Sequence, residues 1–147
     1  MDQPQSSSNR EQVADTMIGL TRLSHLRRAI VAGGDRMEMY LALRRRGYLR
    51  VATTDTCRIA KGQHAVGLIT GLNSLSEIEA TLVQVSRFLC ASAAIAVLID
   101  TREEGFSLKI RARLERLGFR IEAGVRCRQG LVLSAWRQGS GQMENAA

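Results

Sequence analysis

The stretch Leu114–Arg137, LERLGFRIEAGVRCRQGLVLSAWR, contains the transition that decides the fold. A basic helix ends at Leu117-Gly118-Phe119, and the residues that follow alternate between apolar and charged, which is the periodicity of a strand. This alternation places Ile121, Ala123, Val125 and Cys127 on one side. Gln129-Gly130 then reverses the chain, because glycine tolerates the positive φ of a tight hairpin. The stretch predicts a helix followed by an antiparallel hairpin, packed beside the apolar segment 93–99.

Upstream of this stretch, short apolar segments alternate with amphipathic ones. The apolar segments predict buried strands at residues 29–32, 49–54, 65–70 and 93–99. Between the last two, Ser74 and Glu77 have the spacing of a capping box at the start of a helix. Strands that alternate with helices indicate a mostly parallel sheet with helices on both faces and right-handed crossovers. The predicted fold is therefore a three-layer α/β sheet that ends in an antiparallel hairpin.

The chain has 147 residues, a length typical of one domain. Residues 1–10 contain Pro4 and a cluster of Gln, Ser and Asn, which cannot bury enough apolar surface to offset the entropy of ordering. We expect a disordered N-terminal arm over 1–10, a single α/β domain over 11–137, and a flexible C-terminal tail over 138–147.

Basic residues outnumber acidic residues by 21 to 14, and the net charge is +7. Such a surface is either simply solvated or the contact face for an anionic partner, since charge informs on association and not on fold. The expected nucleic-acid contacts are the run Arg44-Arg45-Arg46 and a helical row: Lys109, Arg113 and Arg116. The expected partner is an unidentified protein or a nucleic acid.

The cysteines are three, an odd number without close pairing, and no charged-then-apolar leader opens the sequence. Both observations favour the reducing cytoplasm. The longest apolar run, Leu89–Ile99, is much shorter than the roughly 20 residues that a membrane span requires. The sequence therefore predicts a cytoplasmic protein that makes no membrane contact.

Cys57 and the two histidines are the candidates for a nucleophile and for metal ligands, respectively. Cys57 lies near Arg58 and Lys61, which can lower the pKa of a thiol, and His64 is the only local base. A cysteine nucleophile at Cys57 is thus one alternative. The two histidines, His25 and His64, are far apart and lack a cluster of acidic or cysteine neighbours, so no metal site is expected.

In open α/β sheets, ligands bind beyond the carboxyl ends of the strands. Gly33-Gly34 follows the first strand, and glycines there either admit a ligand close to the backbone or simply form a tight turn. Asp55 follows the second strand at close to the roughly 20-residue offset of an acid that binds ribose hydroxyls. The alternative for Asp55 is a solvated turn cap. Thr70-Gly71 and Asp100-Thr101 end the next two strands.

Over roughly residues 27–137, the chain resembles class I S-adenosylmethionine-dependent methyltransferases. Arg28–Asp35 matches the first strand with its glycine loop, and Val51–Asp55 matches the second strand with its acid. His64–Asn73 matches the fourth-strand motif, and Leu82–Ile99 matches the helix and strand that follow it. Gly118-Phe119 matches the Gly-Phe step before the last strands. The resemblance implies a Rossmann-like sheet that binds S-adenosylmethionine. It assigns cofactor binding to Gly33, Gly34, Asp35, Asp55, Thr70 and Gly71.

The motifs depart from the family pattern in three places. Val31 replaces the acid that opens the first motif, and Asp35 and Met37 replace its later glycines. The carboxylate of Asp35 would repel that of the cofactor unless Arg36 compensates. Residues 56–63 stand where the family has a helix, a strand and another helix. These departures predict cofactor binding that is weak or absent.

Two functions follow from the resemblance. The first is a degenerate methyltransferase-like domain that acts in binding or regulation. The second is a small active methyltransferase, which would use Asp55 for ribose and Gly33-Gly34 for the amino-acid end of the cofactor. In that case Asp55 should point into the same cleft as the glycines, with no structural partner. The missing unit also uncovers the edge of the third strand, which predicts a homodimer through that edge.

Overall fold

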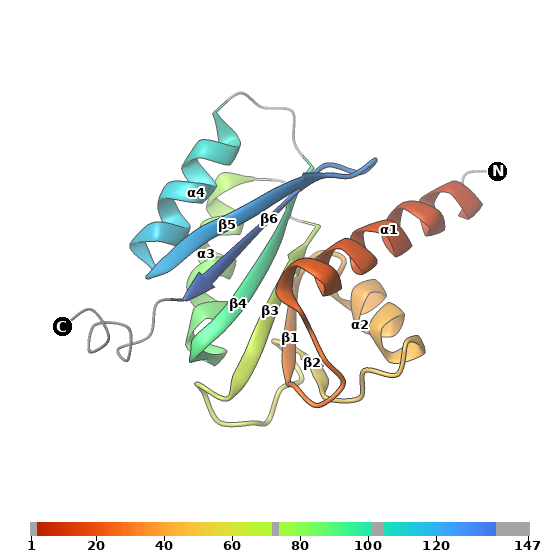
Figure 1. Ribbon diagram of the computed structural model, residues 1–147, viewed down its shortest axis with the longest axis horizontal. Helices are drawn as coiled ribbons and strands as arrows, with labels where there is room; N and C mark the ends of the chain where they lie inside the picture. Colours follow the sequence, from red (N-terminus) through yellow and green to blue (C-terminus); the bar gives the residue numbers. More distant parts are fainter. Residues whose placement is uncertain (1–2, 72–73, 101–104, 138–147) are drawn as a thin grey trace.

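The computed structural model describes residues 3–71, 74–100 and 105–137, with side chains from residue 8 onward. A six-stranded sheet, in the order β2-β1-β3-β4-β6-β5, carries helices on both faces (Figure 1). None of the helices in these ranges is long and apolar enough to cross a lipid bilayer. The elements are α1 (Gln3–Thr21), β1 (Ala29–Gly33), α2 (Arg36–Arg45), β2 (Val51–Thr53), β3 (His64–Thr70), α3 (Leu75–Phe88), β4 (Leu89–Ile99), α4 (Phe106–Arg116), β5 (Phe119–Arg126) and β6 (Leu131–Arg137).

The sheet is parallel from β2 to β4 and antiparallel beyond it. Strand β6 lies beside β4, with Leu131 opposite Ile99, and pairs with β5 on its other side. The turn between β5 and β6 is closed by a 2.7 Å hydrogen bond that the Cys127 N–H donates to the Gly130 carbonyl. These observations confirm the predicted α/β fold and its C-terminal antiparallel hairpin.

One detail of the hairpin differs from the prediction. Ile121 lies opposite Ala135, whereas Ala123 lies opposite Ser134, so the register shifts by one residue between them. Glu122 is the extra residue of a β-bulge, and a bulge reverses the side to which the following residues point. The expectation that Ile121 and Ala123 share one face is therefore wrong. Ile121 instead packs toward the core beneath α3 and α4.

The core has two halves, one on each face of the sheet. Helices α3 and α4 cover one face with buried side chains such as Ile78, Leu82 and Ile110. Helices α1 and α2 cover the other face with side chains such as Met17 and Leu43. Strand β4 is fully buried from residue 93 to residue 99 because it is covered on both sides. The predicted cap is also present, since the Ser74 hydroxyl accepts the Glu77 N–H at 3.2 Å.

Helix α1 begins at Gln3 and so includes most of the segment 1–10, for which we expected a disordered arm. Pro4 lies in the first helical turn, where its missing N–H removes no hydrogen bond. Arg46, at the end of α2, pairs with Glu11 and Asp15 of α1 and so holds this helix against α2. The C-terminal tail expected over 138–147 lies outside the described residues.

The exposed edges of the sheet are β2 and β5. Strand β3 lies between β1 and β4, so the expectation of an exposed third strand is wrong. The missing unit instead leaves β2 as the last strand on that side of the sheet. Residues 56–63 connect β2 to β3 without adding a strand beyond β2. At three residues, β2 is too short to offer an extended pairing edge.

Candidate functional site

A groove opens at the carboxyl edge of the parallel strands, next to α3. Gly33 and Asp55 both line it, so the structure brings together the glycine and the acid that the sequence placed at this edge. Its volume is about 440 Å³. The remaining lining residues come from the ends of β1 and β2 and from the polar face of α3: Ala32, Arg36, Thr54, Glu77, Ala80, Thr81 and Gln84.

Asp55 is already bound within the protein. Its carboxylate accepts a 2.6 Å hydrogen bond from the Thr53 hydroxyl. The guanidinium of Arg36 donates to the two carboxylate oxygens through Nε and Nη2, each at 3.3 Å. The Thr53 hydroxyl, and then Arg36, lower the pKa of Asp55 to about 2. The expectation that Asp55 has no structural partner is therefore wrong.

The bonds to Asp55 predict how it titrates. We expect an Asp55 carboxyl NMR signal with a midpoint near pH 2. Arg36→Ala should raise that midpoint by about one pH unit, because it removes the stabilising cation while the Thr53 hydrogen bond remains. Since the folded-state pKa lies below the unfolded value, the stabilisation is present above about pH 4 and is lost as the pH falls through 2. Arg126→Ala, at an exposed site on β5 at the far side of the sheet from β2, is the control. An unchanged midpoint in Arg36→Ala would contradict the ion pair.

The glycines after β1 pack against the loop after β3. A Cβ at Gly33 would overlap the carbonyl oxygen of Thr70, and one at Gly34 would lie 2.6 Å from the Gly71 oxygen. The Gly34 N–H donates a 3.3 Å hydrogen bond to the same Gly71 carbonyl. The close approach that glycine permits is therefore made to the neighbouring loop of the same chain.

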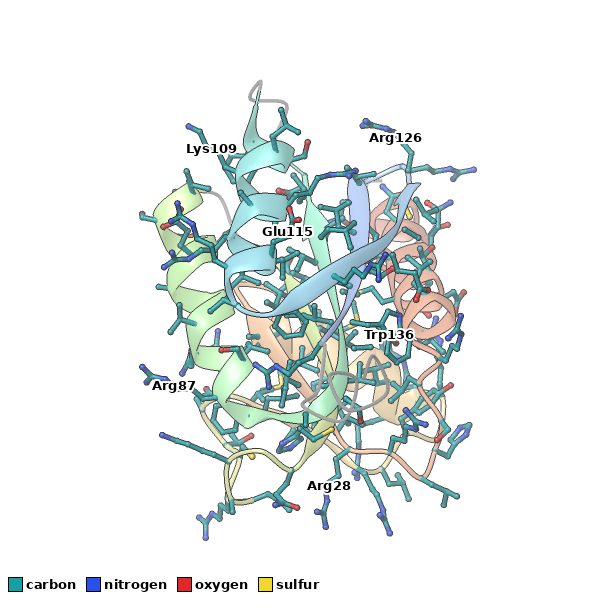
Figure 2. The ribbon with its side chains drawn as sticks, turned by 60° about the vertical axis from the view of Figure 1, so that its left-hand side comes forward. Arg28, Arg87, Lys109, Glu115, Arg126 and Trp136 are labelled. Atoms are coloured by element: carbon teal, nitrogen blue, oxygen red, sulfur yellow. The ribbon has the colours of Figure 1, made fainter. Side chains whose placement is uncertain are left out.

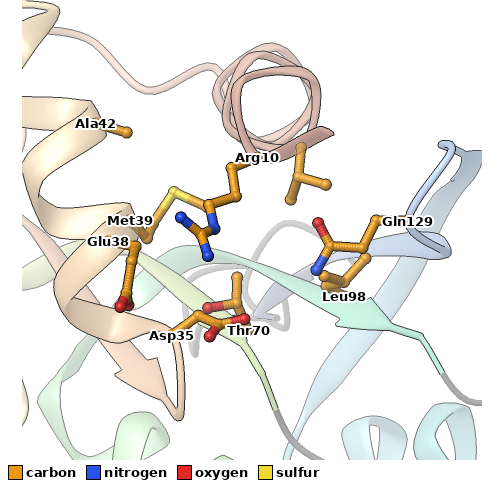
Figure 3. A pocket seen from close by; sticks show the side chains of 9 residues that line it. Arg10, Asp35, Glu38, Met39, Ala42, Thr70, Leu98 and Gln129 are labelled. Carbon is orange, nitrogen blue, oxygen red and sulfur yellow. The ribbon is translucent and has the colours of Figure 1, made fainter. Parts of the chain in front are cut away.

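A second, much smaller pocket lies beneath α1 at the same edge (Figure 3). Asp35 and Thr70 form part of its wall, and the side chain of Arg10 extends from α1 toward them. Its volume of about 20 Å³ is room for about one water. The Thr70 hydroxyl is buried there without a hydrogen-bond partner among the described residues. The cation that lines this pocket is Arg10, whereas Arg36, the residue that could have compensated the charge of Asp35, pairs with Asp55.

Acidic side chains concentrate at this edge. Asp100 follows β4, and its pKa is raised mainly by burial and further by the nearby charge of Asp35. Thr101, expected beside it, lies outside the described residues. Together with Glu38, Asp35 and Asp55, Asp100 makes the carboxyl edge an acidic environment, apart from the cations Arg10 and Arg36.

The arginine run after α2 and the basic row on α4, both expected to contact nucleic acid, differ in how far contacts within the protein occupy them. Arg45 and Arg46 form ion pairs with Glu11 of α1, so they serve helix packing. Arg44 donates to the Leu49 carbonyl at 3.3 Å. On α4, Lys109 and Arg116 are exposed, whereas Arg113 is half-buried. The run after α2 is therefore largely occupied by contacts within the protein.

Cys57 and His64 lie close together at the amino ends of the strands, the end of the sheet opposite the groove. Their Sγ and Nε2 atoms are 3.7 Å apart, and His64 Nδ1 lies 3.3 Å from the Phe88 carbonyl oxygen. Burial lowers the pKa of His64, so its imidazole is neutral at pH 7. The structure thus brings this pair together, but at the amino ends of the strands, where it adds no group to the groove. The described residues contain no cluster of three potential metal ligands.

Two sets of lining residues were not predicted from the sequence. Glu77, Thr81 and Gln84 face the groove from α3. Their spacing of four and three marks one helix face and could have identified them. Arg10 and Gln129 line the small pocket from α1 and the hairpin, and no local pattern connects positions so far apart in sequence.

No protein-family model and no curated protein sequence matches this chain. Solved structures do resemble it. A precorrin-6y C5,15-methyltransferase from Geobacter metallireducens has a TM-score of 0.63 at 14% identity, over 86% of this chain and 88% of that one. A Burkholderia thailandensis 1,6-didemethyltoxoflavin-N1-methyltransferase, solved with S-adenosylhomocysteine, has a TM-score of 0.59 at 12% identity, over 93% and 81%.

The cyclase SpnF has a TM-score of 0.61 at 12% identity, over 88% of this chain and 81% of that one. At such low identities, the similarity reports on the fold alone. The sheet order, the terminal antiparallel hairpin and these similarities lead to one conclusion. The chain has the Rossmann-like fold of the class I S-adenosylmethionine-dependent methyltransferases.

Proposed function

We propose that this protein is a degenerate methyltransferase-like domain that acts in binding or regulation and not in catalysis. The observation that carries the proposal is the pairing of Asp55 with Arg36 and Thr53. A ribose would have to compete with these contacts for the carboxylate. Because the Arg36 guanidinium also donates to the Gly33 carbonyl at 2.9 Å, it joins the two segments that would hold the cofactor.

The glycine loop supports the same proposal. Gly33 and Gly34 pack against Thr70 and Gly71, so their backbone is engaged where a methyltransferase cofactor would require it free. The sheet also ends at β2, without the further unit that would flank an adenine. The neighbours include a cyclase as well as methyltransferases, and one fold commonly serves several functions.

The alternative is a small active methyltransferase. The observation that favours it is the open groove of about 440 Å³, with Gly33 and Asp55 in one wall. Methyl transfer depends largely on proximity and orientation, so the lack of an evident general base does not exclude it. In this alternative, Arg36 would turn away from Asp55 when the cofactor binds.

Calorimetric titration with S-adenosylmethionine distinguishes the two proposals. We expect no saturable binding, with a Kd above about 1 mM, which corresponds to less than about 4 kcal/mol of favourable free energy. Arg36→Ala is the informative variant, because it frees Asp55. Tighter binding by this variant than by the wild type would show that the ion pair between Arg36 and Asp55 prevents S-adenosylmethionine binding. A micromolar Kd for the wild type that Asp55→Ala abolishes would overturn the proposal and support the enzyme.

A further inference from the structure

The acidic side chains of this protein are unevenly divided between the two ends of its parallel strands. The carboxyl edge carries Asp35, Glu38, Asp55 and Asp100. The amino ends of β1 to β4 lie at the opposite edge, because these strands are parallel. The segments that reach this edge, residues 22–28, 46–50, 57–64 and 86–92, contain no Asp or Glu. We call their basic surface the amino-edge face; apart from Arg22 and Arg46, which pair with Glu122 and Glu11, its cations are Arg27, Arg28, Arg50, Arg58, Lys61 and Arg87.

Backbone hydrogen bonds hold these segments together. The Arg28 carbonyl accepts the Ala65 N–H at 2.9 Å, and the Arg50 carbonyl accepts the Ala29 N–H at 3.0 Å. The Gly62 N–H donates to the Arg87 carbonyl at 3.1 Å. The loops before β1, β2 and β3 lie at one end of the molecule (Figure 1). The cations therefore stand on a common, well-anchored surface.

Among the described residues, these cations have no carboxylate partner, and their one side-chain hydrogen bond is from Arg50 to the Leu26 carbonyl at 3.2 Å. None of the six forms an ion pair within the described ranges, unlike Arg36, Arg45 and Arg46. Five of them are exposed, and Arg28 is half-buried. Figure 2 shows Arg28 and Arg87 at one end of the molecule, and Lys109 and Arg126 at the other. The positive potential of this face is thus not neutralised by neighbouring carboxylates.

The face is also hollowed. A groove of about 330 Å³ is lined by Arg28 and Arg50 together with apolar and ring side chains: Leu49, Val51, Ala52, Ile59 and His64. Burial keeps His64 neutral, so the charge of the groove comes from the two guanidinium groups. Guanidinium binds phosphate in a bidentate manner, and the exposed side chain of Leu49 offers an apolar contact to a sugar or base.

We propose that the amino-edge face binds a single-stranded nucleic acid through its phosphate backbone, with one segment of the strand seated in this groove. The positive charge of the face favours binding of a polyanion. The size of the groove favours a narrow, flexible polyanion such as a single strand over a duplex. Leu49 and Ile59, which line the hollow, are exposed, as is Leu26 beside Arg27, so a lipid surface is the competing partner that vesicle binding tests. The inference goes beyond the proposed function, and it stands whether or not the opposite edge binds S-adenosylmethionine.

Fluorescence anisotropy with a short labelled RNA or DNA strand tests this inference. At about 50 mM salt we expect a Kd between about 1 and 100 μM, weakening steeply toward about 200 mM because releasing counterions into a more concentrated salt solution is less favourable. The triple variant Arg27→Glu, Arg58→Glu and Arg87→Glu should weaken binding by at least about tenfold. These exposed side chains contribute little to stability, and circular dichroism would verify that the variant is folded.

The matched control reverses three exposed cations at the other end of the molecule: Lys109→Glu, Arg126→Glu and Arg128→Glu. Both triple variants change the net charge equally, so the control should stay within about threefold of the wild type. Equal losses in the two variants would overturn the inference, as would a failure to bind at about 50 mM salt or tighter binding to duplex DNA. Binding to phosphatidylserine vesicles without binding to the strand would also overturn it, in favour of a membrane surface.

Discussion

Gly33→Ala should destabilise the protein by about 3 kcal/mol or more, which is among the larger effects of a single substitution. Gly33 has a φ of 108°, outside the range that alanine readily adopts. The added methyl group would also overlap the Thr70 carbonyl oxygen, which is backbone and cannot rotate away. Because every residue of β1 pairs with β3, relieving this overlap would separate two central strands. Chemical denaturation would measure the loss of unfolding free energy.

Gly118→Ala is the matched control for this prediction. Gly118 also has a positive φ, of 91°, but a Cβ there would meet open space. It should cost only the conformational penalty, about 1–2 kcal/mol. The difference between the two variants isolates the overlap with Thr70. Equal destabilisation would show that the two loops are not packed as described and would reopen the glycine loop to a ligand.

Arg46→Ala should destabilise the protein by about 2 kcal/mol through the loss of contacts between α1 and α2. The Arg46 guanidinium pairs with Glu11 and, at 3.1 Å, with Asp15. It also donates to the Ala42 carbonyl at 3.0 Å. Its side chain is only 21% exposed, so these bonds are partly shielded from water. The midpoint of urea unfolding would report the change.

Arg44→Ala is the control in the same run of arginines. Arg44 is exposed and donates only to the Leu49 carbonyl among the described groups, so its loss should cost about 0.5 kcal/mol or less. Neither variant should alter nucleic-acid binding, because Arg44 lies outside the amino-edge face and the charge of Arg46 is paired with Glu11 and Asp15. If Arg46→Ala left stability unchanged but weakened nucleic-acid binding, the run would be the contact surface that its sequence first indicated.

Local patterns carried enough information to predict the architecture. The alternation after Phe119 and the turn at Gln129-Gly130 predicted the hairpin, and the spacing of Ser74 and Glu77 predicted the cap of α3. Each depends on residues close in sequence, whose geometry follows from backbone preferences. The bulge at Glu122 was not predictable in this way, because it reflects the pairing of β5 with β6 and leaves the alternation of residue types unchanged.

The sequence by itself determined the order of strands and helices, and which residues stand at the carboxyl edge. Only the tertiary structure decided what those residues do. The sequence position of Asp55 suggested a ribose ligand, but in the structure Arg36 forms an ion pair with it. Arg45 and Arg46 had no evident partner in the sequence, whereas in the structure both pair with Glu11 of α1. Ion pairs and loop contacts depend on distances between segments remote in sequence, which periodicity does not encode. For the same reason, the basic face at the amino edge emerged only when parallel pairing aligned the four strand starts.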